Sequence, residues 1–482
     1  MLGLKMSSKL FYRFRSIDRL LNDKELENSE IYFAAHENLN DPMEGFYDFT
    51  FNGDEIIWKN FFKHYLMCLE RVNNLYLIVG ELQEHTIAMD DIPIYNSFND
   101  FPTPIYKELF EKIAKDFFDI CGEFIKKIAT RTTSIRKDEL STYFNSVHFI
   151  ALQIIQKHYE KYNSVKRDKK LFTIDTKPLK QTIKLIDTIE KLIKEENEAL
   201  DKLNLLIVMQ REIHNELKLV SAINDKLYEK SPNRYFIVEN FVDNYLKCIE
   251  KLTFPSSYIA CFSAQEATNN SSVWGHYGNS HQGVCLIFDA NENETLSFLN
   301  AKVGYGSKGA ILGKRDLKFE EVIYTNSFVE IDFFKSLGSL TIPILEEWYS
   351  DDEGNFSKIK IDNDDVWRKK YWDTFEKNNL TKTKDWQYEH EFRLILHGSL
   401  DNEIDEKYRK LRYDFKNLKG IIFGIKTSVQ EKEKIIKIIR QKCLMTSRND
   451  FEFYQAYYCH INKNIQYKKL SFIKFAGENN AE

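Results

Sequence analysis

The sequence predicts an α+β protein whose core is interrupted by a large helical insertion. Three observations support this prediction. Residues that break helices are scarce in the middle: Gly122 is the only glycine between Glu81 and Trp274, and no proline lies between Ile105 and Lys177. The flanks contain short runs of β-branched and aromatic residues bounded by turn formers. Hydrophobic residues make up 43% of the 482-residue chain and charged residues 29%, which favours a packed core over disorder.

The order along the chain is strands, a helical block, and then strands with a few helices. We expect an α+β core of residues 8–55 and 252–470, a helical insertion of residues 56–251, and a frayed tail of residues 471–482. The Ser428 to Glu431 segment has the capping-box pattern that opens a helix. The strand-like runs of the flanks are residues 30–34, 258–263, 283–288, 418–423 and 451–454.

The insertion contains an apolar seam at helical spacing, interrupted by Glu196 and Gln210. The seam predicts a long helical hairpin, and packing within the chain is favoured because most such stripes are core. Binding of a partner protein or of a second copy through the seam stays open. The basic run of residues 165–170 indicates a solvated loop. The seam consists of Ile186, Ile189, Ile193, Leu200, Leu203 and Ile207.

Composition excludes several classes of protein. The net charge of -5 argues against a dedicated nucleic-acid coat, although a local basic patch is compatible with it. No apolar run is long enough to cross a membrane, and the N-terminus lacks the pattern of a secretory signal. The seven cysteines include no CxxC pair, so we expect free thiols and a cytoplasmic protein without a membrane association.

Two polar clusters lie in the N-terminal flank. If residues 11–16 form a strand, Arg13 and Arg15 share one face and could bind phosphate or carboxylate, or they could be solvated on an edge strand. The second cluster follows a strand. Turn formation alone explains Asn40 and Asp41, whereas Glu44 is not needed for the turn and is a candidate for a binding loop.

A third cluster follows the strand that ends at Ser263. A short helix there would carry Trp274, His276 and Tyr277, which could stack a flat ring and bind its polar edge. Trp274 considered alone is better explained as an ordinary core aromatic residue. His276 and His281 are five residues apart, the wrong spacing for one helix face, so we expect no metal pair.

The fourth cluster, residues 384–396, is the sharpest. Read as one strand, it places Gln387, Glu389, Glu391 and Arg393 on one face. Arg393 could hold one carboxylate ionised while the other accepts a hydrogen bond. The competing interpretation is a solvent-exposed ladder of charges of little energetic value.

These clusters, in this order, resemble a bacterial family of unknown function, DUF2971. The matching motifs are the Tyr12 to Arg15 start, Asn40 to Glu44, Cys261 to Ser263, Trp274 to Tyr277, and Trp386 to Arg393. The resemblance covers the two flanks and not the helical block. It implies that the four clusters converge on one pocket, but it supplies no reaction.

A second resemblance does suggest a reaction. The order of the first strand, the strand ending in Ser263 and the Glu-x-Glu strand resembles an ADP-ribosyltransferase core with a mixed sheet. That resemblance implies NAD as the substrate, Glu391 as a catalytic residue that stabilises oxocarbenium-like charge, and Glu389 as the group that orients or deprotonates the acceptor. Ser263 would border the nicotinamide pocket, although the chain lacks the family's Ser-Thr-Ser triplet. The implied NAD contacts are Tyr12, Arg13, Arg15, Asn40, Asp41, Glu44, Ser263, Trp274, His276, Tyr277 and Arg393.

Three functions therefore compete at the sequence level. The first is an NAD-cleaving or ADP-ribosyl-transferring enzyme, a toxin or anti-phage effector by analogy, with a protein or nucleic-acid acceptor and no metal. The second is a metal-dependent nuclease or phosphodiesterase that uses carboxylates of the second and fourth clusters as ligands, although no lysine is recognisable beside them. The third is a non-catalytic ligand sensor or scaffold.

Overall fold

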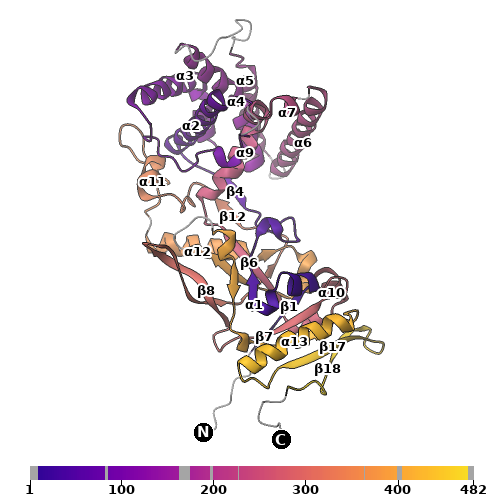
Figure 1. The fold of residues 1–482 in the computed structure, drawn as a ribbon. Helices are drawn as coiled ribbons and strands as arrows, with labels where there is room; N and C mark the ends of the chain where they lie inside the picture. Colours follow the sequence, from indigo (N-terminus) through magenta and orange to yellow (C-terminus); the bar gives the residue numbers. More distant parts are fainter. Residues whose placement is uncertain are drawn as a thin grey trace. The chain divides into compact units, whose positions relative to one another are not determined.

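The computed structural model describes residues 9–81, 85–161, 174–195, 199–225, 227–362, 364–398 and 404–475. The chain forms two compact units. The core unit comprises the described residues of Met1–Phe46, Pro255–Val329 and Phe375–Glu482, and the helical unit comprises those of Tyr47–Phe254 and Glu330–Thr374. Both helices and mixed sheets are present, which confirms the α+β class (Figure 1).

The core unit is built on a mixed sheet with nine strands among the described residues. All neighbours in it are antiparallel except β16 and β17, which are parallel. Four of the predicted strand runs form strands of this sheet, and the fifth, residues 30–34, is divided into two short strands, Glu30–Tyr32 and Ala34–Ala35, of which the second joins the sheet. The spatial order is β10 (Glu320–Glu321), β14 (Glu391–His397), β6 (Ser257–Ser263), β1 (Leu10–Arg15), β7 (Val284–Asp289), β16 (Leu418–Phe423), β17 (Glu452–Cys459) and β18 (Asn464–Lys469), with β3 (Ala34–Ala35) also paired to β6.

Alternation along these strands produces two apolar faces. One face, which includes Phe11 and Phe262, is covered by α13 (Val429–Met445). The predicted capping box of Ser428 and Glu431 opens this helix, as expected. The other face, which includes Tyr12 and Phe14, packs against the 3-10 helix η7 (Gln265–Asn269) and α10 (Ser271–Tyr277). The candidate site lies on this second face.

Smaller elements complete the core unit. A π-helical turn η1 and a short α-helix α1 follow β1, and a long two-stranded hairpin follows β7. Two further strand pairs are short: β2 pairs with β15, and β11 pairs in parallel with β13. Their bounds are η1 (Asp18–Asn22), α1 (Glu25–Asn28), η2 (His36–Asn38), β2 (Glu30–Tyr32), β8 (Thr295–Gly306), β9 (Gly309–Lys318), β11 (Ile323–Tyr324), β13 (Thr381–Lys382), η8 (Lys384–Glu389), η9 (Glu406–Tyr408), β15 (Lys410–Arg412) and η10 (Phe415–Asn417).

The helical unit packs long helices around a core rich in aromatic residues. Asp54 caps α2 by accepting a hydrogen bond from the Ile57 amide, and Thr103 caps α3 in the same way through Tyr106. The elements are β4 (Asp48–Phe51), α2 (Glu55–Val79), η3 (Met89–Asp91), α3 (Pro104–Ala129), β5 (Ile135–Arg136), α4 (Lys137–Lys161), α5 (Lys177–Glu195), α6 (Ala199–Asp225), α7 (Leu227–Lys230), α8 (Pro232–Tyr235), the π-helical η5 (Phe236–Asn240), α9 (Phe241–Cys248), η6 (Ile249–Leu252), β12 (Glu330–Asp332), α11 (Ile342–Tyr349) and α12 (Asp365–Leu380), the last of which ends in the core unit.

Besides a shift of three residues at 252–254, the unit boundaries differ from the sequence prediction at two places. Residues 330–374 were expected in the core but belong to the helical unit, because β12 pairs in parallel with β4 and because the side-chain amide of Asn60 donates to carbonyls of Trp348 and Ser350 at 2.9 and 2.7 Å. Residues 47–55 also belong to the helical unit. Both differences arise from pairing between segments far apart in the chain.

The predicted seam is used within the chain where it is described: Ile189 and Ile207 are buried against each other and Leu185. The side chains of Ile193, Leu200 and Leu203, the basic run of residues 165–170, and the last part of the predicted tail lie outside the described residues. All seven cysteines are free thiols, as expected. Among the described helices, none combines the length and the apolar character needed to cross a membrane.

Candidate functional site

Three neighbouring strands carry a row of polar residues on one face of the core sheet. Tyr12 of β1 lies opposite Ser263 of β6, and Ser263 lies opposite Glu391 of β14. Residues directly opposite each other point to the same face of a sheet, and so do residues two apart on one strand. Arg393 therefore shares this face, opposite Cys261. Segments separated by more than 370 residues meet here because their strands are neighbours.

Five charged side chains form a buried cluster at the end of this row. The charged cluster consists of three carboxylates and two cations, and each side chain is between 1% and 4% exposed. The Lys382 ammonium lies 3.1 Å from Glu44 Oε1, and 2.8 and 2.9 Å from one oxygen each of Glu389 and Glu391. One lysine therefore joins all three carboxylates.

Arg393 supplies the second cation of the charged cluster. Its Nε donates to Glu391 Oε1 at 2.9 Å, and its Nη2 donates to Glu44 Oε2 at 2.7 Å. The remaining Nη1 donates to the backbone carbonyl of Asn379 at 2.6 Å. A guanidinium with this many fixed acceptors is held in one orientation, so it fixes the Glu391 carboxylate in turn.

Local turns bring the distant members of the cluster together. Asp41 accepts a hydrogen bond from the Met43 amide at 2.9 Å and another from the Thr383 hydroxyl at 3.3 Å. This turn presents Glu44 to the cations, while Asn40 beside it is exposed. The Asn-Asp-Pro segment is therefore both a turn and the support of a cluster residue.

Aromatic groups border the carboxylates. The Tyr277 hydroxyl donates to Glu389 Oε1 at 2.6 Å, and the Tyr324 hydroxyl accepts from the Glu391 amide at 2.8 Å. The Lys382 ammonium lies 5.0 Å from the centroid of the half-buried Trp386 ring. The exposed His276 ring lies 6.3 Å from the same indole. The hydroxyls of Tyr277 and Tyr324 and the ring of Trp386 therefore lie next to the charged cluster.

The environment of the charged cluster lowers the pKa of Glu391 and raises the pKa values of Glu389 and Glu44. Burial by itself would raise the pKa of Glu391, but Arg393 and Lys382 outweigh burial and lower that pKa to about 2. Burial raises the pKa of Glu389 despite Lys382, and the charge of Glu391 adds to the increase. Burial also raises the pKa of Glu44. Two neighbouring carboxyl groups with opposite shifts are the usual arrangement of an acid–base pair.

Several predicted site residues lie elsewhere. Arg13 and Arg15 do share a face, but it is the opposite face of the sheet. Arg13 donates to the Cys261 and Tyr32 carbonyls at 3.4 Å each, and Arg15 pairs with Glu25. Neither contacts the charged cluster. Trp274 is 1% exposed and its indole N–H donates to the Thr268 carbonyl at 2.8 Å, so it is a core residue.

The alternation of the fourth cluster predicts a single strand, and this prediction is wrong. Residues Lys384–Glu389 form the 3-10 helix η8, His390 has a left-handed backbone (φ 45°), and the strand begins at Glu391. Glu389 nevertheless reaches Glu391 through Lys382, so the two carboxylates meet by a turn and not by strand alternation. The side chains are buried, so the interpretation as a solvated ladder is wrong.

Sequence reasoning missed four supporting residues. Lys382 lies in a Thr-Lys-Thr-Lys run that reads as a solvated segment, and nothing in its spacing marks it. The backbone carbonyl of Asn379 accepts a hydrogen bond from Arg393, and the Tyr324 hydroxyl accepts one from the Glu391 amide. His36 lies 3.0 Å from Asn379 Oδ1, and burial together with Arg393 lowers its pKa to about 4, so it is neutral. Lys382 thus lies beside the carboxylates, contrary to the expectation from the sequence that no lysine does.

Among the described residues, no group of three or more His, Cys, Asp or Glu side chains is arranged to hold a metal ion. In the charged cluster, oxygens of each carboxylate already accept from Lys382 or Arg393. Binding of a divalent cation there would require the two resident cations to move.

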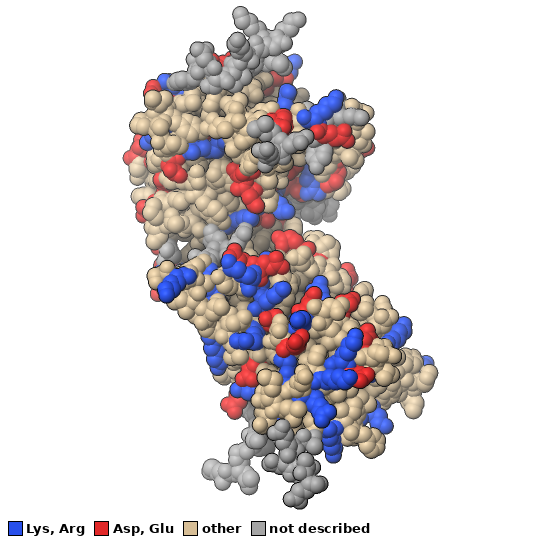
Figure 2. All heavy atoms as spheres, viewed as in Figure 1, with Lys and Arg blue, Asp and Glu red and all other residues tan. Residues whose placement is uncertain are grey.

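A basic patch lies on the surface of the core unit. Figure 2 shows Lys and Arg side chains gathered over α13. The helix carries two acidic residues and a larger number of basic ones: Lys432, Lys434, Lys437, Arg440 and Lys442. The near-neutral total charge thus conceals a local patch, which composition alone left open.

Comparison with known proteins identifies one segment. Residues 273–394 match the family model described as protein of unknown function DUF2971. No curated protein and no solved structure matches the chain. The matched segment contains all of α10 except its first two residues, together with Lys382, Glu389, Glu391 and Arg393, and thus most of the charged cluster. As its motifs predict, residues 273–394 are similar to the DUF2971 family of proteins of unknown function.

Proposed function

We propose that this protein is an NAD-using enzyme that breaks the nicotinamide–ribose bond, with transfer of ADP-ribose to an acceptor or to water. The observation that carries the proposal is the row of Tyr12, Ser263 and Glu391 across three adjacent strands. These are the three strands on which the ADP-ribosyltransferase resemblance rests. Their adjacency gives that resemblance a spatial basis, whereas the match to a family of unknown function does not address the reaction.

The ionisation of the carboxylates suits this chemistry. In the proposed step the C1′–N bond breaks, its electron pair leaves with nicotinamide, and positive charge develops on the ribose ring. Glu391, kept ionised by Arg393 and Lys382, would stabilise that charge. An acceptor oxygen then attacks C1′ and loses its proton to Glu389, whose higher pKa makes it the better base.

The structure changes the assignment of the cofactor contacts. Arg13 lies on the opposite face and Tyr12 is buried in the same apolar cluster as Trp274, so no side chain of the first strand is assigned a contact with the dinucleotide. Lys382 stays paired with Glu389 and Glu391 in this assignment, because it helps to keep Glu391 ionised. Among the aromatic residues, Trp386 and Tyr277 replace Trp274 as candidates for stacking on nicotinamide.

The test is release of nicotinamide from NAD by the purified full-length chain, with cell lysate as a source of acceptor. We expect release to fall at least 100-fold in Glu391→Gln and in Glu389→Gln. Glu321→Gln, an exposed residue on the adjacent strand β10, is the matched control and keeps full activity. Thermal unfolding of each variant checks that the fold survives. Intact NAD in every condition would refute the proposal.

One observation favours the metal-dependent phosphodiesterase as a second candidate. Lys382 meets three carboxylates, and a lysine beside carboxylates could stabilise a charged phosphoryl transition state. Against it, the carboxylates are arranged around cations of the chain itself. Cleavage of DNA or RNA that chelator abolishes, with NAD left intact, would favour this candidate over the first.

A further inference from the structure

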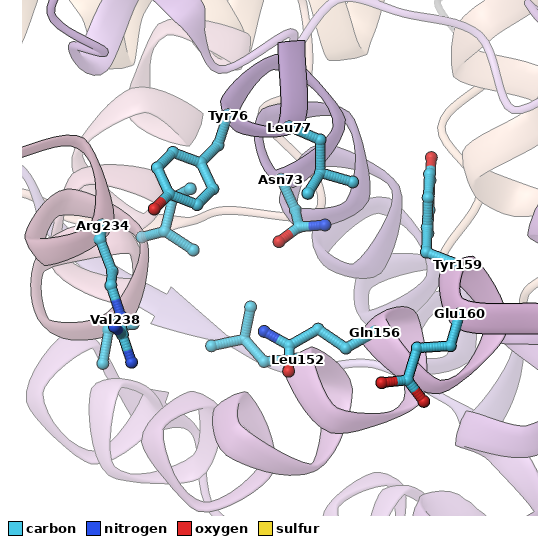
Figure 3. A pocket seen from close by; sticks show the side chains of 10 residues that line it. Asn73, Tyr76, Leu77, Leu152, Gln156, Tyr159, Glu160, Arg234 and Val238 are labelled. Atoms are coloured by element: carbon cyan, nitrogen blue, oxygen red, sulfur yellow. The ribbon is translucent and has the colours of Figure 1, made fainter. Parts of the chain in front are cut away.

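The helical unit contains a cavity of about 250 Å³ that the proposed reaction does not use. Helices α2 and α4 form two of its walls, and α8 with the π-helical turn η5 forms the third (Figure 3). The volume lies just below the range of about 300–1,000 Å³ typical of sites for drug-sized ligands, so it suits one ring system with a substituent. The lining residues are Asn73, Tyr76, Leu77, Leu152, Gln156, Tyr159, Glu160, Arg234, Ile237 and Val238.

A buried amide is aimed into this cavity. Asn73 is only 4% exposed, and its side-chain amide makes no hydrogen bond to any residue within the described ranges. Figure 3 shows it facing Gln156 across the cavity. The amide atoms of Asn73 are not among the buried polar atoms left without a partner, so they open onto the cavity, where a polar group of a ligand can replace water. Side-chain amides of this kind bind adenine through paired donor and acceptor atoms.

The walls and ends of the cavity complement a nucleotide. Leu77, Leu152 and Val238 provide apolar surfaces for the faces of a base. Arg234 and Glu160 lie on opposite sides in Figure 3. The exposed Arg234 guanidinium suits a phosphate, and the Glu160 carboxylate suits an exocyclic amine.

The wall that carries Arg234 is built rigidly. The backbone amides of Asn233 and Arg234 donate to Glu81 at 3.1 and 3.0 Å, and the Asn233 side chain donates to the Gly80 and His85 carbonyls at 2.8 and 3.0 Å. The following turn, η5, is π-helical, and π-helical turns occur frequently at functional sites. This geometry positions Ile237 and Val238 along the cavity.

We propose that the cavity of the helical unit binds an adenine mononucleotide, with the base between α2 and α4 and the phosphate at Arg234. The inference does not rest on the proposed reaction in the core unit. It makes the helical unit a ligand-sensing module, whatever chemistry the core unit performs.

Calorimetric titration of the full-length chain with AMP, adenosine and GMP tests the proposal. We expect saturable binding of AMP and binding of GMP weaker by tenfold or more. Asn73→Leu should weaken AMP and adenosine alike by tenfold or more, and Arg234→Ala should weaken AMP but not adenosine. Arg136→Ala, an exposed arginine of the same unit, is the matched control and leaves both affinities unchanged.

A nucleotide could also enter the core unit, and Glu391→Gln distinguishes the two sites. AMP binding that survives in Glu391→Gln and falls in Asn73→Leu supports the cavity. Binding lost in Glu391→Gln but kept in Asn73→Leu overturns the inference and leaves the proposed reaction standing. Failure of AMP and adenosine to bind, or equal affinity for GMP, also overturns it. Circular dichroism of Asn73→Leu separates loss of binding from loss of fold.

Discussion

Two buried glutamates, one in each unit, have pKa values that are shifted in opposite directions. In the core unit, Glu391 is 2% exposed and contacts two cations, which lower its pKa to about 2 against the effect of burial. In the helical unit, Glu70 is fully buried and accepts hydrogen bonds from the hydroxyls of Tyr106 and Tyr159, at 2.9 and 2.5 Å. Burial raises its pKa in spite of them. The two pKa shifts differ because Arg393 and Lys382 together outweigh burial at Glu391, whereas the hydroxyl donors do not outweigh burial at Glu70.

The two glutamates also differ in the role that their environments allow. A carboxylate kept ionised next to one with a raised pKa can act in a reaction, whereas Glu70 bound by neutral hydroxyls joins α2 to α3 and α4. Three experiments test this distinction, and the first removes one of the two cations that contact Glu391.

Replacing Arg393 by Met should have the largest effect. The change leaves Glu44 and Glu391 buried with Lys382 as their one remaining cation in the described cluster, and losing one member of a buried ion pair costs about 3–5 kcal/mol. Urea unfolding of the full chain, followed by probes of each unit, measures it. Arg136→Met, which breaks an exposed pair with Asp48, should cost no more than about 1 kcal/mol. Equal losses in the two variants would contradict a stabilising role for the cluster.

The dependence of stability on pH should differ in sign between the two glutamates. Glu391 has a lowered pKa in the fold, so its contribution is present above the usual value near 4.5 and is lost as pH falls towards about 2. Glu70 has a raised pKa, so its contribution is present below 4.5 and is lost as pH rises through its folded value.

We therefore expect Glu391→Gln to flatten the fall in unfolding free energy below pH 4.5, by on the order of 1–3 kcal/mol across that range. Glu70→Gln should instead gain stability relative to the wild type as pH rises above 4.5. Unfolding free energies measured from pH 3 to pH 8 check both. Slopes of the same sign would show that the charge of the partner does not govern these groups.

Removing one neutral donor should have the smallest effect. Tyr159→Phe leaves Glu70 with the Tyr106 hydroxyl, so we expect a loss of about 1–2 kcal/mol from the helical unit. Tyr458→Phe, an exposed tyrosine of the core unit, serves as the control with no measurable change. A loss for Tyr159→Phe as large as that for Arg393→Met would remove the contrast between charged and neutral partners.

Much of the fold could be predicted from the sequence. The scarcity of glycine and proline indicates the helical block, and the runs of β-branched and aromatic residues coincide with β2, β6, β7, β16 and β17. The motif residues Glu44, Tyr277, Glu389, Glu391 and Arg393 do converge, as the family resemblance implies. Period and propensity are local properties, so a single sequence reveals them.

Other features could not be read from local patterns. Alternation from residue 384 onwards predicts a strand, yet η8 forms because tertiary contacts of Glu389 with Lys382 and Tyr277 override it. Arg13 and Tyr12 are neighbours in sequence, and which of them faces the site depends on the two layers that cover β1.

The sequence by itself therefore determined the class of the fold, the helical block and the residues able to form a site. Only the tertiary structure decided that Lys382 joins Glu44, Glu389 and Glu391, and that Arg13 is excluded from them. The physical reason is that ionisation and ion pairing depend on burial and on distances of about 3 Å between side chains far apart in the chain, and local spacing does not encode these distances.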